Sequence, residues 1–498
     1  MNILKPKFFI IFISTFCLIH IFTLTISPIV WQDETFFTSI SNSFSANSTF
    51  YLDVSPEYLK GLPVYIYGPV YFVLNGTIIK YFGLGPFQSR IIGLLSGLLI
   101  YLVIYLIGLR EKKQSTAVLL VFIAFLLDVF FNASLHKGRN DTLALLLYLT
   151  SLYLFIKSWQ PNTLYLIFSG ILYACAIITT PRILFTLPGF LLISIYQIFS
   201  SKEKIYLLKI YIAWIMPIIV IPVLAILIAF RDFNNYWKYI ILVSSQTQKL
   251  FLKIPFVPLE EFPLIITFGL CVILMITKFK IKELLDKVTI LLLLNLTFYY
   301  TLVVDVGPYS VLIIPFYYLI LINFYITFVE RFGNRRIIYF LIAPLLCFNV
   351  FIYTIKNTYL LADLNNRQYD VVSNYVKTNI PSNSHVIGDE VYYYAVLNAG
   401  SKFQYMHLHF PSLDTIENYR RKVFDYDYLF LSDRLSQRDL NIYQLYAKYS
   451  TLEKIGRLEK PKKRILPINK LIPDYDFSVF GYSGTLYKRK KGINSHPK

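Results

Sequence analysis

The first thirty residues, MNILKPKFFIIFISTFCLIHIFTLTISPIV (residues 1–30), decide the fold class of this chain. A basic start precedes an apolar core that is too long for an ordinary signal peptide and has no clear small-residue cleavage site. We therefore interpret this segment as an uncleaved membrane-spanning helix. The segment must be helical because the bilayer core offers no water to the backbone N–H and C=O groups.

Comparable apolar segments recur along residues 1–355, and most of them approach or exceed the roughly 18 residues that a spanning helix needs. The chain of 498 residues is 56% hydrophobic and only 15% charged, which is unusual for a soluble protein. The sequence therefore predicts a polytopic α-helical membrane protein with about eleven transmembrane helices. The predicted spans are residues 8–30, 89–109, 116–133, 142–157, 163–180, 183–200, 210–230, 263–277, 288–304, 311–329 and 337–355.

The charges of the connecting loops predict the topology. Alternate connections, such as LREKKQS (109–115) and ERFGNRR (330–336), carry more Lys and Arg than Asp and Glu. By the positive-inside rule these loops and the N-terminus are cytoplasmic, whereas the long loop at residues 31–88 is extracytoplasmic. An odd number of spans places the C-terminus on that outer side as well. The membrane is the plasma membrane if the source is prokaryotic.

Charged residues appear throughout the chain from residue 356 onward, which indicates an extracytoplasmic α/β domain at residues 356–498 after a transmembrane domain at residues 1–355. The segments SHVIGDE (384–390) and YDYLFLSD (426–433) are typical of short buried strands. LNIYQLYAKYSTLEKIGRL (440–458) predicts an amphipathic helix between strands. The final basic segment is typical of a frayed, solvated tail.

The composition argues against several classes of protein. The four cysteines all lie within predicted spans, so neither a disulfide framework nor a cysteine-based metal site is expected. Topology explains the net charge of +19 better than nucleic-acid binding does. His407 and His409 would share one face of a strand, but an ordinary polar face is the favoured interpretation. We therefore expect no metal cofactor and no nucleic-acid partner.

Two adjacent acids follow the first predicted helix in WQDETFF (31–37), where the membrane meets water. One interpretation is that Asp33 and Glu34 are simply solvated at a helix end. Alternatively, a partly buried carboxylate acts as a general base, because burial raises its pKa and excludes competing water. Adjacent side chains on a helix point about 100° apart, so the two acids are expected to have different roles, with one facing a reactant and the other a supporting partner. The loop that they begin is too long for a simple connector, and its aromatic second half suits a helix in the interface plane.

The pieces around these acids occur in a recognisable order. The acid pair is followed by YGPVY (67–71), then by GPFQSRIIGLLSGLL (85–99) and HKGRNDTLALLLYLTSLYLF (136–155), and later by GPYSVLIIPFYYLIL (307–321). Over roughly residues 1–330 this order resembles the integral-membrane GT-C glycosyltransferases, particularly the protein O-mannosyltransferase and aminoarabinose-transferase-like superfamily, which includes bacterial family 39-like enzymes. The resemblance implies inverting transfer of a sugar from a polyprenyl-phosphate donor to an acceptor hydroxyl outside the cytoplasm.

The resemblance also implies roles for the two acids. Similar enzymes place the essential acid first, so Asp33 is the predicted base and Glu34 supports the acceptor or the geometry of the loop. The reverse division remains open. The reaction further needs cations that stabilise the negative charge on the leaving phosphate.

Basic residues near the outer helix ends are the candidates for this phosphate. Arg90 opens the second predicted helix, where the alternative is an anchor to lipid headgroups, and Lys60 is a second candidate among the aromatic residues of the first loop. In the second outer loop, Lys137 or Arg139 would bind the phosphate and Asp141 would act as a supporting acid that orients a cation, binds the sugar or assists a metal. The alternative for this loop is a polar turn that caps the next helix. Arg182 lies at a similar helix end but is less informative.

Two other classes remain as alternatives to the enzyme. A transporter or flippase of lipid-linked sugars would favour ionisable groups in mid-helix, whereas the notable ones here are at outer helix ends. A membrane-anchored receptor would leave the acids of the first loop unexplained. A nucleotide-sugar donor is disfavoured because the cytoplasmic loops are short and no P-loop or dinucleotide fingerprint occurs. The expected partners are the polyprenyl-phosphate-sugar donor, membrane lipids, and a protein, lipid or glycan acceptor.

Overall fold

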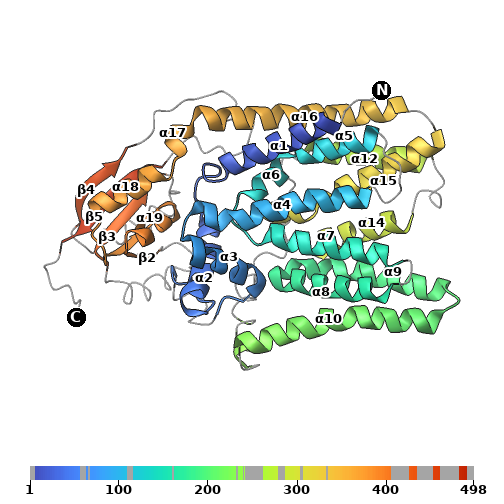
Figure 1. The fold of residues 1–498 in the computed structure, drawn as a ribbon, viewed down its shortest axis with the longest axis horizontal. Coiled ribbons are helices and arrows are strands. Elements are labelled where there is room, and N and C mark those ends of the chain that lie inside the picture. The colour runs from blue at the N-terminus through green and yellow to red at the C-terminus, as the bar shows by residue number, and fades with distance from the viewer. Residues whose placement is uncertain are drawn as a thin grey trace. The chain divides into compact units, whose positions relative to one another are not determined.

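We describe the protein from a computed structural model. The structure describes residues 6–55, 63–65, 68–108, 116–159, 162–230, 234–238, 241, 262–278, 286–302, 307–332, 335–404, 426–433, 452–459 and 482–490. Figure 1 shows the arrangement of the helices and strands along the chain. The predicted site residue Lys60 and the histidines His407 and His409 lie outside the described residues.

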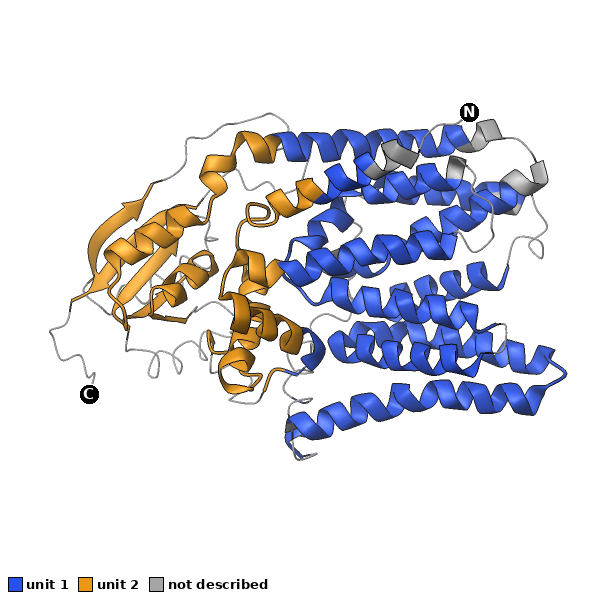
Figure 2. Cartoon of the chain, viewed as in Figure 1, with its two compact units in different colours: residues 1–17, 65–71, 91–358 blue, residues 18–64, 72–90, 359–498 orange. Residues whose placement is uncertain are grey.

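The chain divides into two compact units, which are coloured in Figure 2. The helical unit contains residues 1–17, 65–71 and 91–358, and the mixed unit contains residues 18–64, 72–90 and 359–498. The mixed unit thus joins most of the long first loop to the segment that follows the last apolar helix. The predicted division of the chain at residue 355, which places that loop in the transmembrane domain, stays a prediction.

The helical unit is built from long apolar helices. Five helical segments among the described residues are long and apolar enough to cross a membrane, or six if the bent pair α5–α6 counts as one span. The predicted count of about eleven spans stays a prediction. Among the described residues, the helices that lie wholly or mostly in this unit are α1 (Pro6–Thr23), α4 (Pro86–Gly108), α5 (Thr116–Leu126), α6 (Val129–Leu135), α7 (Asp141–Lys157), α8 (Thr163–Thr179), η3 (Pro181–Thr186), α9 (Leu187–Ser200), α10 (Lys204–Phe230), α12 (Phe262–Lys278), α14 (Lys287–Leu302), η6 (Gly307–Leu312), α15 (Ile314–Phe332) and α16 (Arg335–Ala362).

Aromatic side chains fill part of the core of this unit. Helix α8 packs against both α7 and α10. The rings of Tyr173 on α8 and Trp214 on α10 both contact Phe190 on α9, with centroid distances of 5.3 Å and 5.6 Å. All three side chains are fully buried. Such contacts add packing energy to a region where lipid, which is equally apolar, provides little hydrophobic driving force.

Two predicted helices differ from the observed ones. The segment at residues 116–133 was predicted as one span, but α5 and α6 are bent by 52° at a short break. Asp128 lies in this break and accepts a hydrogen bond from the Phe131 backbone N–H, at 2.8 Å, so it caps α6 and does not continue α5. The first helix was predicted to reach residue 30, but α1 ends at Thr23 and is followed by turns before Pro28.

Gly68 explains why glycine is needed in the YGPVY segment. Its φ of +60° lies in the left-handed region, and an added Cβ would stand 0.9 Å from the carbonyl oxygen of Ile178 near the end of α8. No side chain fits in that space. The glycine therefore allows the segment before α3 (Pro69–Phe82) to approach the end of α8 closely.

The mixed unit combines first-loop helices with a small sheet. Helix α2 (Gln32–Asn47) and most of α3 lie in it, which agrees with an ordered first loop. The later segment contains α17 (Leu364–Arg367), α18 (Asp370–Asn379), η7 (Glu390–Tyr392) and α19 (Tyr393–Asn398), with strands β1 (His385–Gly388), β2 (Lys402–Gln404), β3 (Tyr428–Ser432), β4 (Leu452–Leu458) and β5 (Gly484–Arg489).

The five strands form one mixed sheet in the order β2-β1-β3-β5-β4. The two predicted strands near residues 385 and 428 are present as the parallel neighbours β1 and β3. The predicted helix at residues 440–458 is wrong over its last part, because residues 452–458 form β4, which pairs antiparallel with β5. Its remaining residues lie outside the described ones. Pairing with β5 outweighs the local pattern here, and Gly456 weakens any helix in this segment.

Candidate functional site

The two acids of the first loop lie in the first turn of α2, where negative charge is favoured by the helix dipole. Glu34 is fully buried, whereas Asp33 is partly exposed. The two neighbouring acids therefore differ in exposure. Their division into base and support stays a prediction.

Glu34 is held by a bidentate ion pair. Arg90, at the start of α4, donates from Nε to Glu34 Oε1 at 3.0 Å and from Nη2 to Oε2 at 2.6 Å, and both side chains have 0% exposure. Arg90 also donates from Nη1 to the Leu24 carbonyl oxygen at 2.8 Å. The guanidinium that was predicted to bind the donor phosphate therefore directs three of its donors at groups within its own unit. Direct contact with a phosphate would require Arg90 to leave this buried arrangement.

A tyrosine from the C-terminal segment completes the surroundings of Glu34. The Tyr394 hydroxyl on α19 lies 2.9 Å from Glu34 Oε1 and 2.9 Å from the Ser89 hydroxyl, which is itself 3.0 Å from Glu34 Oε1. We refer to Glu34, Ser89, Arg90 and Tyr394 as the Glu34 cluster. It ties α2, α4 and α19 together at one buried carboxylate. Sequence reasoning missed Tyr394, which is 360 positions from Glu34 along the chain.

The electrostatics of the Glu34 cluster involve opposing effects. Burial raises the pKa of Glu34 above its ordinary value, while the Arg90 charge and the hydrogen bonds from Arg90, Tyr394 and Ser89 stabilise the carboxylate and oppose that shift. Burial and the nearby Glu34 charge raise the pKa of Tyr394, so its hydroxyl keeps its proton and can donate. The fully satisfied arrangement is typical of a residue that positions its neighbours.

A second cluster forms in the helical unit, around the loop between α6 and α7. Arg139 donates from Nε to Asp141 Oδ2 at 2.6 Å, and the two side chains are only 7% and 4% exposed. The Arg139 guanidinium lies 5.0 Å from the Tyr309 ring centroid, and that of Arg182 lies 3.3 Å from the same centroid. We refer to Arg139, Asp141, Arg182 and Tyr309 as the Tyr309 cluster. Two guanidinium groups thus meet on one aromatic ring with a single carboxylate.

The other residues predicted in this loop have separate surroundings. Lys137 is half-buried, with its Nζ 5.0 Å from the centroid of the Phe130 ring. Asn140 is the residue before α7, but its side chain donates to the Thr179 carbonyl and makes no capping bond. Arg182 and Tyr309 belong to η3 and η6. Arg182 was noted from its position near a predicted helix end, but the shared ring contact joins segments that are far apart in the chain.

No group of three His, Cys, Asp or Glu side chains that could hold a metal occurs among the described residues. Asp141 accepts a hydrogen bond from Arg139, and its predicted role as a supporting acid stays a prediction. Its Oδ1 is buried and has no hydrogen-bond partner within the described part of the chain, so this oxygen is available to accept from a ligand hydroxyl.

Comparisons with known proteins agree with this architecture. The family model described as dolichyl-phosphate-mannose-protein mannosyltransferase matches residues 67–228. Among curated proteins, none matches the chain in sequence. The fold is similar to that of ArnT from Cupriavidus metallidurans bound to undecaprenyl phosphate, with a TM-score of 0.61 and 12% identity over 97% of this chain and 98% of that one.

A second solved structure is similar over most of the chain. The Archaeoglobus fulgidus oligosaccharyltransferase in its apo form gives a TM-score of 0.50 and 11% identity over 91% of this chain and 74% of that one. At such identities the likeness concerns the fold. Together with the long apolar helices, these findings show that the chain is a polytopic integral membrane protein with the fold of the GT-C glycosyltransferases.

Proposed function

We propose that this chain is a membrane glycosyltransferase that transfers a sugar from a polyprenyl-phosphate donor to an acceptor hydroxyl. The observation that carries the proposal is the shared fold, over 97% of the chain, with a protein whose structure holds undecaprenyl phosphate. A lipid-linked donor also suits a chain whose predicted cytoplasmic loops are short, because its phosphate remains at the membrane interface while its chain lies among apolar helices.

The Tyr309 cluster supports binding of the donor phosphate. Breaking a glycosyl–phosphate bond leaves negative charge on the phosphate, and fixed cations stabilise that charge. The cluster holds two arginines against one carboxylate, so its described side chains carry a net positive charge. Arginine presents a planar fork that suits bidentate contact with phosphate. We therefore assign Arg139 and Arg182 to the phosphate, with Lys137 as a further candidate.

The acids of α2 support a divided role. General base catalysis needs a carboxylate that can reach an acceptor hydroxyl. Glu34 is fully occupied within its cluster, whereas Asp33 is partly exposed on the same turn of helix. We assign the base to Asp33 and the support of this turn to Glu34. A single displacement by a hydroxyl that Asp33 deprotonates would invert the configuration of the sugar.

Arg90 receives a revised role in this proposal. Its donors to Glu34 and to the Leu24 carbonyl favour a positioning residue over a direct phosphate ligand. Removal of either partner would leave an uncompensated buried charge. Lys60 keeps its predicted role as a further phosphate cation, and it lies outside the described residues.

The charge pattern of the loops supports a membrane topology for the chain. We propose about eleven spans, a cytoplasmic N-terminus and an extracytoplasmic C-terminal domain. The acids then lie on the outer face, where the acceptor is a protein, a lipid or a glycan. Asp141, which orients Arg139, is the supporting acid of the donor site.

The experiment that tests the function uses purified protein in detergent without a sealed compartment. A radiolabelled polyprenyl-phosphate sugar and an extract of candidate acceptors should yield labelled product, while the matched nucleotide sugar should not. Product formed under these conditions cannot result from transport. Transfer from the nucleotide sugar alone would overturn the lipid-linked donor. Hydrolysis of the labelled donor without any labelled acceptor would overturn the proposal that the protein is a transferase.

A further inference from the structure

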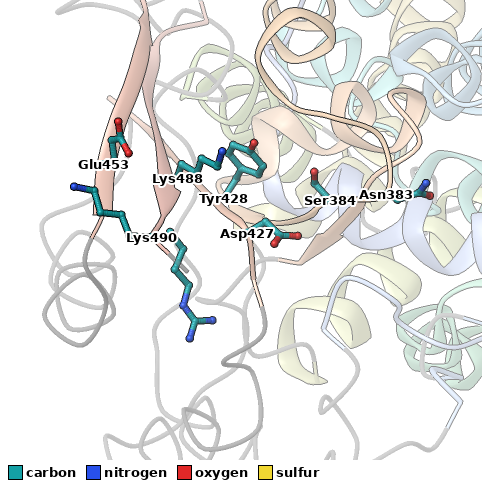
Figure 3. Close-up of a pocket in the computed structure, with 8 residues that line it drawn as sticks. Asn383, Ser384, Asp427, Tyr428, Glu453, Lys488 and Lys490 are labelled. Atoms are coloured by element: carbon teal, nitrogen blue, oxygen red, sulfur yellow. The ribbon is translucent and has the colours of Figure 1, made fainter. Parts of the chain in front are cut away.

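The mixed unit contains a hollow of about 740 Å³ at one end of its sheet. Figure 3 shows the side chains that surround it. None of them belongs to the Glu34 cluster or the Tyr309 cluster. The lining residues are Asn383, Ser384, Asp427, Tyr428, Glu453, Lys488, Arg489 and Lys490.

The sheet register explains why these residues meet. Tyr428 on β3 is directly opposite Lys488 on β5, and Lys488 is directly opposite Glu453 on β4. Directly opposite residues point to the same face of a sheet, so three neighbouring strands supply one side of the hollow. Asn383 and Ser384 come from the link between α18 and β1, which is the next strand beside β3.

The hollow carries more positive than negative charge. Three consecutive basic residues, Lys488 to Lys490, line it together with the carboxylates of Asp427 and Glu453. Asp427 already uses one carboxylate oxygen, because Oδ2 accepts from the His385 backbone N–H at 3.0 Å. Glu453 faces Lys488 across the strand pair. The excess of cations favours a ligand with a negative group.

The mixture of side chains also indicates what else the ligand contains. A bare anion would be repelled by Asp427 and Glu453, whereas carboxylates accept hydrogen bonds from hydroxyl groups. The amide of Asn383 can both donate and accept, whereas the hydroxyl of Ser384 donates to the Pro381 carbonyl oxygen at 2.7 Å and can accept from a ligand. The volume lies within the roughly 300–1,000 Å³ of small-molecule sites, so it holds more than a single phosphate.

We infer that this hollow binds an anionic saccharide, a sugar that bears a phosphate or carboxylate group. The cations take the negative group, and the carboxylates, amide and hydroxyl take the sugar hydroxyls. The further assignment of this saccharide as part of the acceptor rests on the proposed function, whereas binding itself does not.

Binding is tested by saturation-transfer NMR on the full-length protein in detergent, with glucose 6-phosphate, glucuronate, glucose and inorganic phosphate as probes. Glucose 6-phosphate and glucuronate should compete with each other, and each should bind at least about tenfold more tightly than glucose or phosphate. Their affinity should fall as salt concentration rises. Equal binding of glucose would overturn the anionic requirement, and equal binding of inorganic phosphate would overturn the saccharide.

Charge-reversal variants locate the site. The pair Lys488→Glu and Lys490→Glu should weaken glucose 6-phosphate binding by about tenfold or more. Lys454→Glu is the matched control, because Lys454 follows Glu453 on the same strand and its side chain points to the opposite face. An equal loss in the control, or no binding by the unmodified protein, would overturn the site.

The Asp33→Asn variant separates the two proposals. It should bind glucose 6-phosphate as the unmodified protein does while it loses sugar transfer. Normal transfer without probe binding would overturn this site and leave the proposed function standing. Probe binding with normal transfer by the Asp33 variant would overturn the assigned base and leave this site standing.

Discussion

The guanidinium of Arg90 donates two hydrogen bonds, of 3.0 Å and 2.6 Å, to the carboxylate of Glu34, and both side chains are completely buried. Glu34 is the immediate neighbour of Asp33 on α2. The pair therefore fixes the helical turn from which the proposed base projects. This relationship makes the Glu34 cluster a positioning device whose parts can be removed one at a time.

Arg90→Met should be strongly destabilising, because it leaves the Glu34 carboxylate buried and unpaired. Breaking one partner of a buried pair costs about 3–5 kcal/mol. The double variant Glu34→Gln with Arg90→Met should be less destabilising than the single Arg90 variant, since no buried charge remains. Thermal unfolding in detergent ranks the stabilities of the unmodified protein, the double variant and the single Arg90 variant.

The exposed pair between Arg457 and Asp433 is the control for that series. Arg457 Nη2 lies 2.8 Å from Asp433 Oδ2, but the Arg457 side chain is 47% exposed. Surface pairs contribute about 0–1 kcal/mol, so Arg457→Met should scarcely change the unfolding temperature. A similar effect of the Arg90 and Arg457 substitutions would contradict the positioning role.

Tyr394→Phe should reduce sugar transfer without unfolding the protein. The change keeps the buried ring but removes the hydroxyl that lies 2.9 Å from Glu34 Oε1. A lost hydrogen bond to a charged group costs about 1.5–3 kcal/mol. Tyr375→Phe is the matched control, because the Tyr375 hydroxyl has no hydrogen-bond partner among the residues that the structure describes. Unchanged turnover in Tyr394→Phe, at equal protein yield, would argue against its role.

Arg182→Ala should weaken use of the donor more than use of the acceptor. The guanidinium lies over the Tyr309 ring beside Arg139, so its removal takes one cation from the proposed phosphate site. The expected result is a higher KM for the polyprenyl-phosphate sugar with a nearly unchanged KM for the acceptor. Lys157→Ala, at the far end of α7 from Asp141, should change neither constant. Equal changes in both constants for Arg182→Ala would remove it from the phosphate site.

Local sequence patterns predicted many of the apolar helices well, because hydrophobic length and flanking polar residues are local properties. Helix α7 was predicted at residues 142–157 and occurs at Asp141–Lys157. The break at Asp128 was missed, since its stability depends on distant partners. The Tyr318 hydroxyl on α15 donates to Asp128 Oδ2 at 2.9 Å, and Asn349 on α16 donates to that same hydroxyl's oxygen at 3.1 Å.

Some residues of the candidate site could also be recognised from local sequence, whereas others depend on contacts between distant segments. The acid pair could be identified by its position after the first apolar helix, and Arg139 and Asp141 by their crowding in one loop. Tyr394 and Tyr309 could not be connected to these residues, because their contacts join segments that are far apart in the chain. Arg90 was identified as a notable cation from its charge and position. Its ion pair with the buried Glu34 could not be predicted, because the two residues are far apart in the chain.

The most direct test of the central claim is the rate of sugar transfer by Asp33→Asn, with its folding checked by thermal unfolding in detergent. Asparagine keeps the size of the side chain but cannot accept the acceptor's proton. We predict that transfer falls by about 10²–10⁴-fold, as expected for loss of a general base, while the unfolding temperature is unchanged. Near-normal transfer by the Asp33→Asn protein, with a genuine donor and acceptor, would contradict the account.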